Sequence, residues 1–375
     1  MRIQTTPLGV AAWLLLAALI TLLLSLRVPT PLSDWNFTHW LFNYEEEFVK
    51  RGLLGESLRL AGLPTEYAFI SALSTAILVV LCAALVVTFS TPLRRHPKLY
   101  ALSGFFLLAI SHPATLQHFR FDLGRFDGVT LLLTLFSLYI IARHRYWLAS
   151  IIVPGVLAMV VLVHEAALFM FLPMVMAFWL HKYGIVRREL IYVGLVTLTL
   201  TLFTYSISTN GLASTYGLDE HLTVMQSKHG DKVVRSSLNI LHYGSVSENL
   251  TRTQENALTR ARLYQHIGML LVLAPLLLLL WPLVRTFGRT ERLLLFSAFA
   301  PLLLYPLGHD HFRWWALALT NLFIVVSLVC AIRPTAAAQL AEICDRQRGL
   351  ITTLILLGVA VGPLGVTGNF PLSLI

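Results

Sequence analysis

Long apolar segments recur along this chain and constrain its fold more than any other feature. Because lipid offers the backbone no hydrogen-bond partner, an apolar segment that crosses a bilayer folds as a helix, and a full crossing takes about 20 residues. The pattern therefore predicts an all-α polytopic membrane protein of about eleven transmembrane helices. The apolar segments are 8–25, 67–90, 99–112, 128–142, 147–163, 166–180, 190–208, 264–284, 291–307, 314–332 and 350–366.

The composition agrees with a bilayer as the main solvent. Hydrophobic residues make up 57% of the chain and charged residues only 13%, about half the charged share of a soluble domain. Charge this sparse cannot cover the surface of a soluble globule. The net charge of +9 arises mostly from Lys and Arg in short links between apolar segments. Such charges are typical of membrane topology and lipid headgroup contact, and they argue against a nucleic-acid partner.

The positive charges also predict an orientation. Short cytoplasmic loops collect Lys and Arg, and the rule is met here if the N-terminus is cytoplasmic. The first apolar segment has no cleavage pattern after it, so we expect it to remain as a signal anchor. The prediction is one transmembrane domain, 1–375, in a bacterial inner membrane, with its active side extracytoplasmic. The basic links on the cytoplasmic side are then 94–98, 143–145, 182–188, 285–292 and 333–348.

Two long loops then face the extracytoplasmic side, one after the first helix and one after the seventh. The first is 26–66, where Trp35, Trp40 and Phe42 are mixed with charged residues. This mixture predicts a helix that lies in the lipid headgroup layer. The second loop, 209–263, is polar and rich in Ser, Thr and Asn.

Four groups of ionisable residues fall at the predicted extracytoplasmic helix ends. Ionisable groups near hydrocarbon are costly and persist where they are paired or functional, so we expect the four groups to face one shared cavity. Each group alone has a plainer interpretation, as a solvated helix face, an ion pair at a helix start, a polar turn or an interface anchor. The groups are 43–52 with Glu45, Glu46, Glu47, Lys50 and Arg51; 118–128 with Arg120, Asp122, Arg125 and Asp127; His164 with Glu165; and 308–315 with His309, Asp310, His311 and Arg313.

Together these residue types suit group transfer on a lipid-linked phosphate. A carboxylate can deprotonate an acceptor hydroxyl, and guanidinium or ammonium groups can stabilise the departing phosphate. The candidate general bases are Glu45 and Glu47, ahead of Asp34. The candidate substrate-binding residues are Lys50, Arg51, Arg120, Asp122, Arg125, Asp127, His164, Glu165, His309, Asp310 and Arg313.

No metal or other cofactor is assigned from the sequence. Adjacent His309, Asp310 and His311 cannot easily aim three side chains at one ion, and no HExxH spacing occurs. A divalent cation bound by these groups with His164, Glu165 or Asp122 stays open as an alternative. The three cysteines form no CxxC pair, and the chain has neither a Gly-rich phosphate loop nor GxSxG.

The layout resembles the C-type glycosyltransferase (GT-C) superfamily and related bacterial polysaccharide polymerases and ligases. Members of that group have many spans and a long extracytoplasmic loop after the first helix. The region that matches this loop is 26–66, and its acids are Asp34, Glu45, Glu46, Glu47 and Glu56. Four short stretches, 48–53, 124–127, 164–165 and 310–313, are similar to segments of uncharacterised bacterial membrane proteins of this general kind. The resemblance implies a polyprenyl-phosphate-linked sugar donor and an essential acid in the first loop. The loop lacks the Asp-Asp or Asp-x-Asp of many members.

These observations predict a membrane glycosyltransferase or polysaccharide polymerase that acts on a polyprenyl-(pyro)phosphate-linked sugar at the extracytoplasmic face. Its expected partners are membrane lipids, the lipid-linked donor, a glycan acceptor and polysaccharide assembly proteins of the cell envelope. Two alternatives remain. A lipid or glycan transporter would call for inverted repeats and broken helices, and a non-enzymatic envelope assembly partner would tolerate charge swaps in all four groups.

Overall fold

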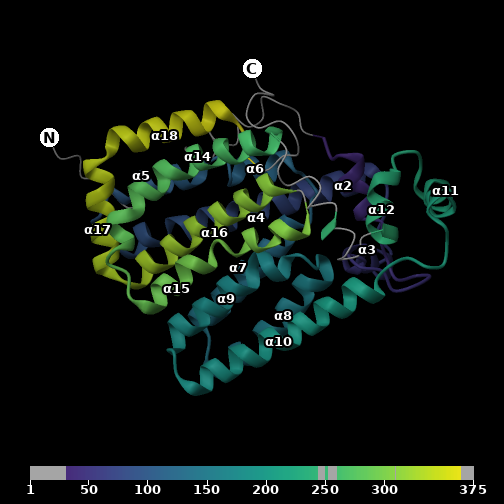
Figure 1. Ribbon diagram of the computed structural model, residues 1–375, viewed down its shortest axis with the longest axis horizontal. Coiled ribbons are helices and arrows are strands. Elements are labelled where there is room, and N and C mark those ends of the chain that lie inside the picture. The colour runs from purple at the N-terminus through teal and green to yellow at the C-terminus, as the bar shows by residue number, and fades with distance from the viewer. Residues whose placement is uncertain (1–30, 244–249, 252–259, 309, 365–375) are drawn as a thin grey trace.

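The computed structural model describes residues 31–243, 250–251, 260–308 and 310–364, and this part of the chain consists of helices joined by short links (Figure 1). Every predicted apolar segment within these residues forms a helix, so the all-helical prediction is confirmed for them. The first segment, 8–25, lies outside the described residues. The helices of the bundle are α4 (Tyr67–Arg95), α5 (Leu102–Ser111), α6 (Leu116–Phe121), α7 (Asp127–Arg143), α8 (Tyr146–Val163), α9 (Ala167–Tyr183), α10 (Arg187–Asn210), α14 (Arg260–Val284), α15 (Arg289–Ser297), the 3-10 helix η1 (Ala300–Leu307), α16 (His311–Ile332), α17 (Pro334–Arg346) and α18 (Arg348–Val361).

Within the described residues, five helical stretches are long and apolar enough to cross a membrane: α4, α8, α10, Arg289–Leu307 and α16. They differ in what surrounds them. Most side chains of α16 are buried among other helices, whereas Leu195, Leu198 and Leu202 of α10 are exposed. Apolar side chains that point away from the protein along a long helix are what a lipid-facing span requires.

The basic links meet at one end of the bundle. Arg95 donates a hydrogen bond to the carbonyl of Ala331 at 3.0 Å, and Arg333 pairs with Glu291 at 2.6 Å. Helix α17 lies at this end, and the helices of the two long loops lie at the opposite end (Figure 1). The bundle therefore separates its basic links from its long loops.

The two long loops form a folded cap on the bundle. The first contributes α2 (Asp34–His39) and α3 (Leu53–Leu60), and the second contributes α11 (Leu218–His229) and α12 (Arg235–Tyr243). We define the cap as residues 31–66 and 211–243. Hydrogen bonds join its halves, because Val234 N–H donates to Thr38 Oγ1 at 3.1 Å and Ser237 Oγ donates to the Trp35 carbonyl at 3.0 Å.

The aromatic residues of the first loop lie inside this cap. Trp40, Leu41 and Phe42 are each 2% exposed and pack with Leu238 and Leu241 of α12. The sequence alone predicts this aromatic cluster in the lipid headgroup layer. The structure gives its members a protein environment, because the second loop supplies an apolar surface that the first loop alone does not have.

Candidate functional site

A group of paired charges lies where the cap meets the bundle. It combines residues from the α2–α3 link, the α6–α7 link, the α8–α9 link and the start of α16. We call it the Arg–carboxylate network. Its members are Arg51, Asp122, Arg125, Asp127, His164, Glu165, Asp310 and Arg313.

Three acids of the network lie at the starts of helices, where the cap meets the bundle. Asp127 is the first residue of α7, Asp310 is the N-cap of α16, and Glu165 lies two residues before α9. The unpaired N–H groups of a helix start carry partial positive charge, which stabilises a nearby carboxylate. The sequence therefore places three acids at three helix starts, and the packing of those helices brings the acids together.

Arg313 occupies the buried centre of the network and is 5% exposed. Its Nε donates to Asp127 Oδ2 at 2.7 Å, and its Nη1 donates to Asp310 Oδ2 at 2.7 Å. Its Nη2 lies 3.0 Å from His164 Nε2. Because a guanidinium can only donate, this nitrogen of His164 is the acceptor, and the Ala166 backbone N–H lies 3.2 Å from the other ring nitrogen, Nδ1.

Arg125 links the centre of the network to the cap. It donates to Asp122 at 2.9 Å and to Asp310 at 2.6 Å, and its guanidinium stacks over the Trp35 ring, 5.0 Å from the centroid. Asn36 on α2 donates to the other oxygen of Asp122 at 3.1 Å. Asp310 therefore bridges Arg125 and Arg313, and the cap fixes the direction of the Arg125 side chain.

Arg51 joins the network from the α2–α3 link through Glu165. Its Nε and Nη2 form a forked pair with the carboxylate, with distances of 2.9 Å to Oε2 and 2.5 Å to Oε1. Arg51 adopts a φ of 64°. A non-glycine residue in this left-handed region is strained and is retained only where its surroundings hold it. Here the ion pair holds it.

The arginines keep Asp122, Glu165 and Asp310 ionised. Burial by itself raises the pKa of Asp122, Glu165 and Asp310, but the facing guanidinium groups outweigh burial and lower all three pKa values. A carboxylate whose pKa is lowered in this way holds its partner firmly and accepts a proton poorly.

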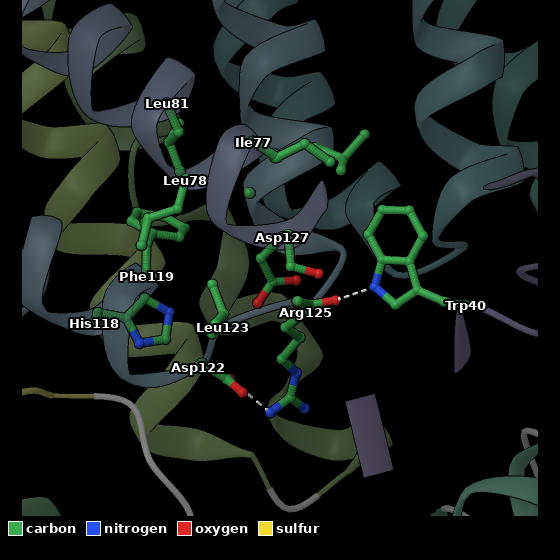
Figure 2. Close-up of a pocket in the computed structure, with 14 residues that line it drawn as sticks. Trp40, Ile77, Leu78, Leu81, His118, Phe119, Asp122, Leu123, Arg125 and Asp127 are labelled. Carbon is green, nitrogen blue, oxygen red and sulfur yellow. Dashed lines mark hydrogen bonds and ion pairs between the residues drawn. The ribbon is translucent and has the colours of Figure 1, made fainter. Parts of the chain in front are cut away.

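Two pockets adjoin the network, and Gly124 and Arg125 line both of them. The first, which we call the lipid-side pocket, has a polar wall containing Asp122, Arg125 and Asp127 and an apolar wall from α4 and α6 (Figure 2). The apolar wall contains Ile77, Leu78, Leu81 and Phe119. Two buried polar atoms of the lining, Ser74 Oγ and His118 Nδ1, have no hydrogen-bond partner within the described structure.

The second, which we call the cap-side pocket, lies under α2. It is lined by Trp35, Asn36, His39, Arg51, Gly124, Arg125, Phe126 and His164. Two guanidinium groups and two imidazoles thus face one small space. His39 Nε2 is buried and makes no hydrogen bond to any described residue.

The predicted general bases lie outside the network, on another surface of the cap. Glu45, Glu46 and Glu47 line a third pocket, the glutamate cleft, with Tyr216, His221, Lys228 and His229. Lys228 pairs with Glu46 at 3.3 Å, and Glu47 accepts hydrogen bonds from the Ser214 and Thr215 backbone. Asp34 pairs with Lys232 at 3.5 Å on the exposed side of α2.

The remaining predicted residues are distributed as follows. Lys50 is buried next to Arg51, and its backbone N–H donates to the Gly211 carbonyl at 2.9 Å. Arg120 lies on α6, and burial lowers its pKa. His309 lies outside the described residues. Among the residues that are described, no three His, Cys, Asp or Glu side chains are grouped so that they could hold a metal ion.

The expected single cavity is therefore realised in part. In the structure, Arg51 lies with charged residues of the predicted groups 118–128, 164–165 and 308–315. The three glutamates lie in a separate cleft. Asn36 and His39 were not predicted from the sequence. The one sequence signal for them is that they are polar residues among the aromatic side chains of 35–42. An amide and an imidazole in such a segment are candidates for buried contacts.

Comparison of the chain with protein-family models, with curated proteins and with solved structures finds no match.

Proposed function

We propose that this protein is an integral membrane glycosyltransferase or polysaccharide polymerase. It transfers a sugar from a polyprenyl-phosphate or polyprenyl-pyrophosphate donor to a glycan acceptor at the extracytoplasmic face. The proposal includes about eleven spans, a cytoplasmic N-terminus and a location in a bacterial inner membrane. It rests above all on one observation: four segments from Arg51 to Arg313 meet in one ionised network beside an amphipathic pocket.

The lipid-side pocket has the two kinds of surface that such a donor requires. An isoprenoid chain is apolar along its length and ends in an anion. The Ile77, Leu78 and Leu81 wall suits the first carbon units of the chain, and Arg125 suits the phosphate. Sugar hydroxyls would donate hydrogen bonds to Asp122, and they would donate to or accept from the unpartnered Ser74 Oγ.

The reaction needs stabilisation of a leaving phosphate. As the acceptor oxygen bonds to the anomeric carbon, the bond from that carbon to the phosphate oxygen breaks, and the phosphate takes the electron pair. Arg125 and Arg51 are held in fixed directions by Asp122, Asp310 and Glu165. Fixed cations in a site of low water content stabilise developing negative charge without reorganisation.

A sugar-transfer assay in nanodiscs tests this proposal. Purified protein would receive a radiolabelled polyprenyl-phosphate sugar and oligosaccharide acceptors, and products would be separated by chromatography. Transfer by the wild type that is lost in Arg125→Met and kept in the exposed cytoplasmic-side control His144→Gln supports it. Movement of the lipid across the bilayer without bond formation would support the transporter alternative.

A further inference from the structure

We propose that His39 is the proton acceptor of this site: its Nε2 lone pair takes the proton of the acceptor hydroxyl in the cap-side pocket. This inference rests on the proposed transfer function and deepens it by naming a residue. The base is then the imidazole of His39, in place of the first-loop carboxylates of Glu45 and Glu47 that the sequence predicts.

The tautomer of His39 follows from its one hydrogen bond. Its Nδ1 lies 2.7 Å from the backbone carbonyl of Trp35. A carbonyl oxygen can only accept, so Nδ1 carries the proton and donates it. In the neutral ring, Nε2 is then left with a lone pair and no proton. Since that nitrogen has no partner among the described residues, the lone pair is free to accept.

The packing of His39 holds the ring in one orientation. The ring lies 3.9 Å from the Trp35 ring and 5.1 Å from the Phe42 ring, measured between centroids, and the residue is 4% exposed. A general base is effective when it is oriented by a third group. The Trp35 carbonyl is that group here, because it fixes both the direction of the ring and the position of its proton.

The pKa of His39 depends on the charges of Arg51, Arg125 and Glu165. Burial lowers the pKa of His39, Arg51 and Arg125 lower it further, and the Trp35 carbonyl and Glu165 oppose them. The free protein therefore holds a neutral imidazole at neutral pH. An anionic phosphate placed between Arg51 and Arg125 would offset the two cations and raise this pKa. Binding of the donor would thus make His39 a stronger base in the complex in which the transfer takes place.

The acceptor hydroxyl oxygen forms a bond to the anomeric carbon, and the bond between that carbon and the donor phosphate oxygen breaks. The phosphate leaves with the electron pair, and the hydroxyl proton passes to His39 Nε2. The imidazolium then gives this proton to water or to the released phosphate. Arg125 lines both pockets, so it can hold the donor phosphate where the two pockets meet.

Kinetics provide the first test. We expect His39→Gln to lower kcat by about 10²-fold or more, a typical contribution of a general base, and to leave the donor KM within about threefold. In His39→Ala, added imidazole should restore part of the rate. His144→Gln, an exposed histidine at the opposite end of the bundle, serves as the control. Thermal unfolding of each variant separates loss of chemistry from loss of folding.

Nitrogen-15 NMR of histidine-labelled protein in nanodiscs provides a second test that needs no activity. The His39 signal, assigned by its loss in His39→Gln, should show an unprotonated Nε2 at neutral pH. Added polyprenyl phosphate should shift it toward the protonated form. A protonated Nε2 in the free protein, or an unchanged rate in His39→Gln, overturns the inference. If wild type transfers no sugar from any donor, the proposed function fails, and the NMR result still decides the state of His39.

Discussion

The Arg–carboxylate network and the glutamate cleft use the same kinds of residue in different surroundings. The side chains of Arg313 and Asp127 are 6% and 2% exposed, whereas those of Lys228 and Glu45 are 45% and 53% exposed. A buried pair cannot lose one partner without leaving a charge in a poorly solvated place, and an exposed pair can. Charged motifs that are equally prominent in a sequence therefore differ in their energetic role according to their burial in the fold.

The largest expected effect separates the two regions by stability. Arg313→Met should destabilise the protein by about 3–5 kcal/mol, because it would leave the buried Asp127 carboxylate without its ion-pair partner. Lys228→Met in the glutamate cleft should cost less than about 1 kcal/mol. Chemical denaturation in detergent micelles would measure both. Equal losses would show that the network is no more buried in solution than the cleft.

The next largest effect distinguishes the Arg–carboxylate network from the glutamate cleft by enzymatic activity. On the proposed function, Asp122→Asn should reduce sugar transfer by roughly 10²-fold, because it weakens the contact that directs Arg125 at the donor phosphate. Glu45→Gln should stay within about threefold of wild type, because its carboxylate faces Lys228 in solvent. If Glu45→Gln abolishes transfer while Asp122→Asn does not, the reaction centre is the glutamate cleft.

A smaller effect tests how tightly the network is held by its backbone. Gly124 has a φ of +81°, and a Cβ there would lie 2.3 Å from Leu32 Cδ1 and 3.0 Å from Ser74 Oγ. Gly124→Ala should cost about 1–3 kcal/mol through strain and crowding. Gly62 is a matched control, since its φ is +62° with open space around it. Gly62→Ala should cost about 1 kcal/mol, and denaturation curves would compare the two.

The smallest effect concerns pH. The pKa of Glu165 is lowered well below its ordinary 4.5 by Arg51, against the effect of burial. The unfolded chain binds the proton first as pH falls, so the stability from this pair is present above about pH 4.5 and declines below it. The double variant Arg51→Met, Glu165→Met should flatten the acid limb of a melting-temperature profile. Glu46→Gln, in the solvated cleft, should alter that limb less.

Much of the fold could be predicted from the sequence, and less of the site. Apolar length predicted the helices, because the side-chain pattern and the backbone hydrogen-bond requirement are local. The pairing of Arg313 with Asp127 spans 186 residues, and no local rule connects them. The glutamate run was more conspicuous than His39 in the sequence, although the structure gives His39 the more buried position.

The sequence by itself determined that the described chain is helical, that its basic links lie apart from its long loops, and that three carboxylates sit at helix starts. The tertiary structure decided which charges share a space. That choice depends on how the cap packs on the bundle, since Asn36 and Trp40 hold residues 123–124 through hydrogen bonds of 2.8 Å and 2.7 Å. Such long-range packing sets the burial of each charged group, and burial sets its energy, so the candidate site could be recognised only after the fold was known.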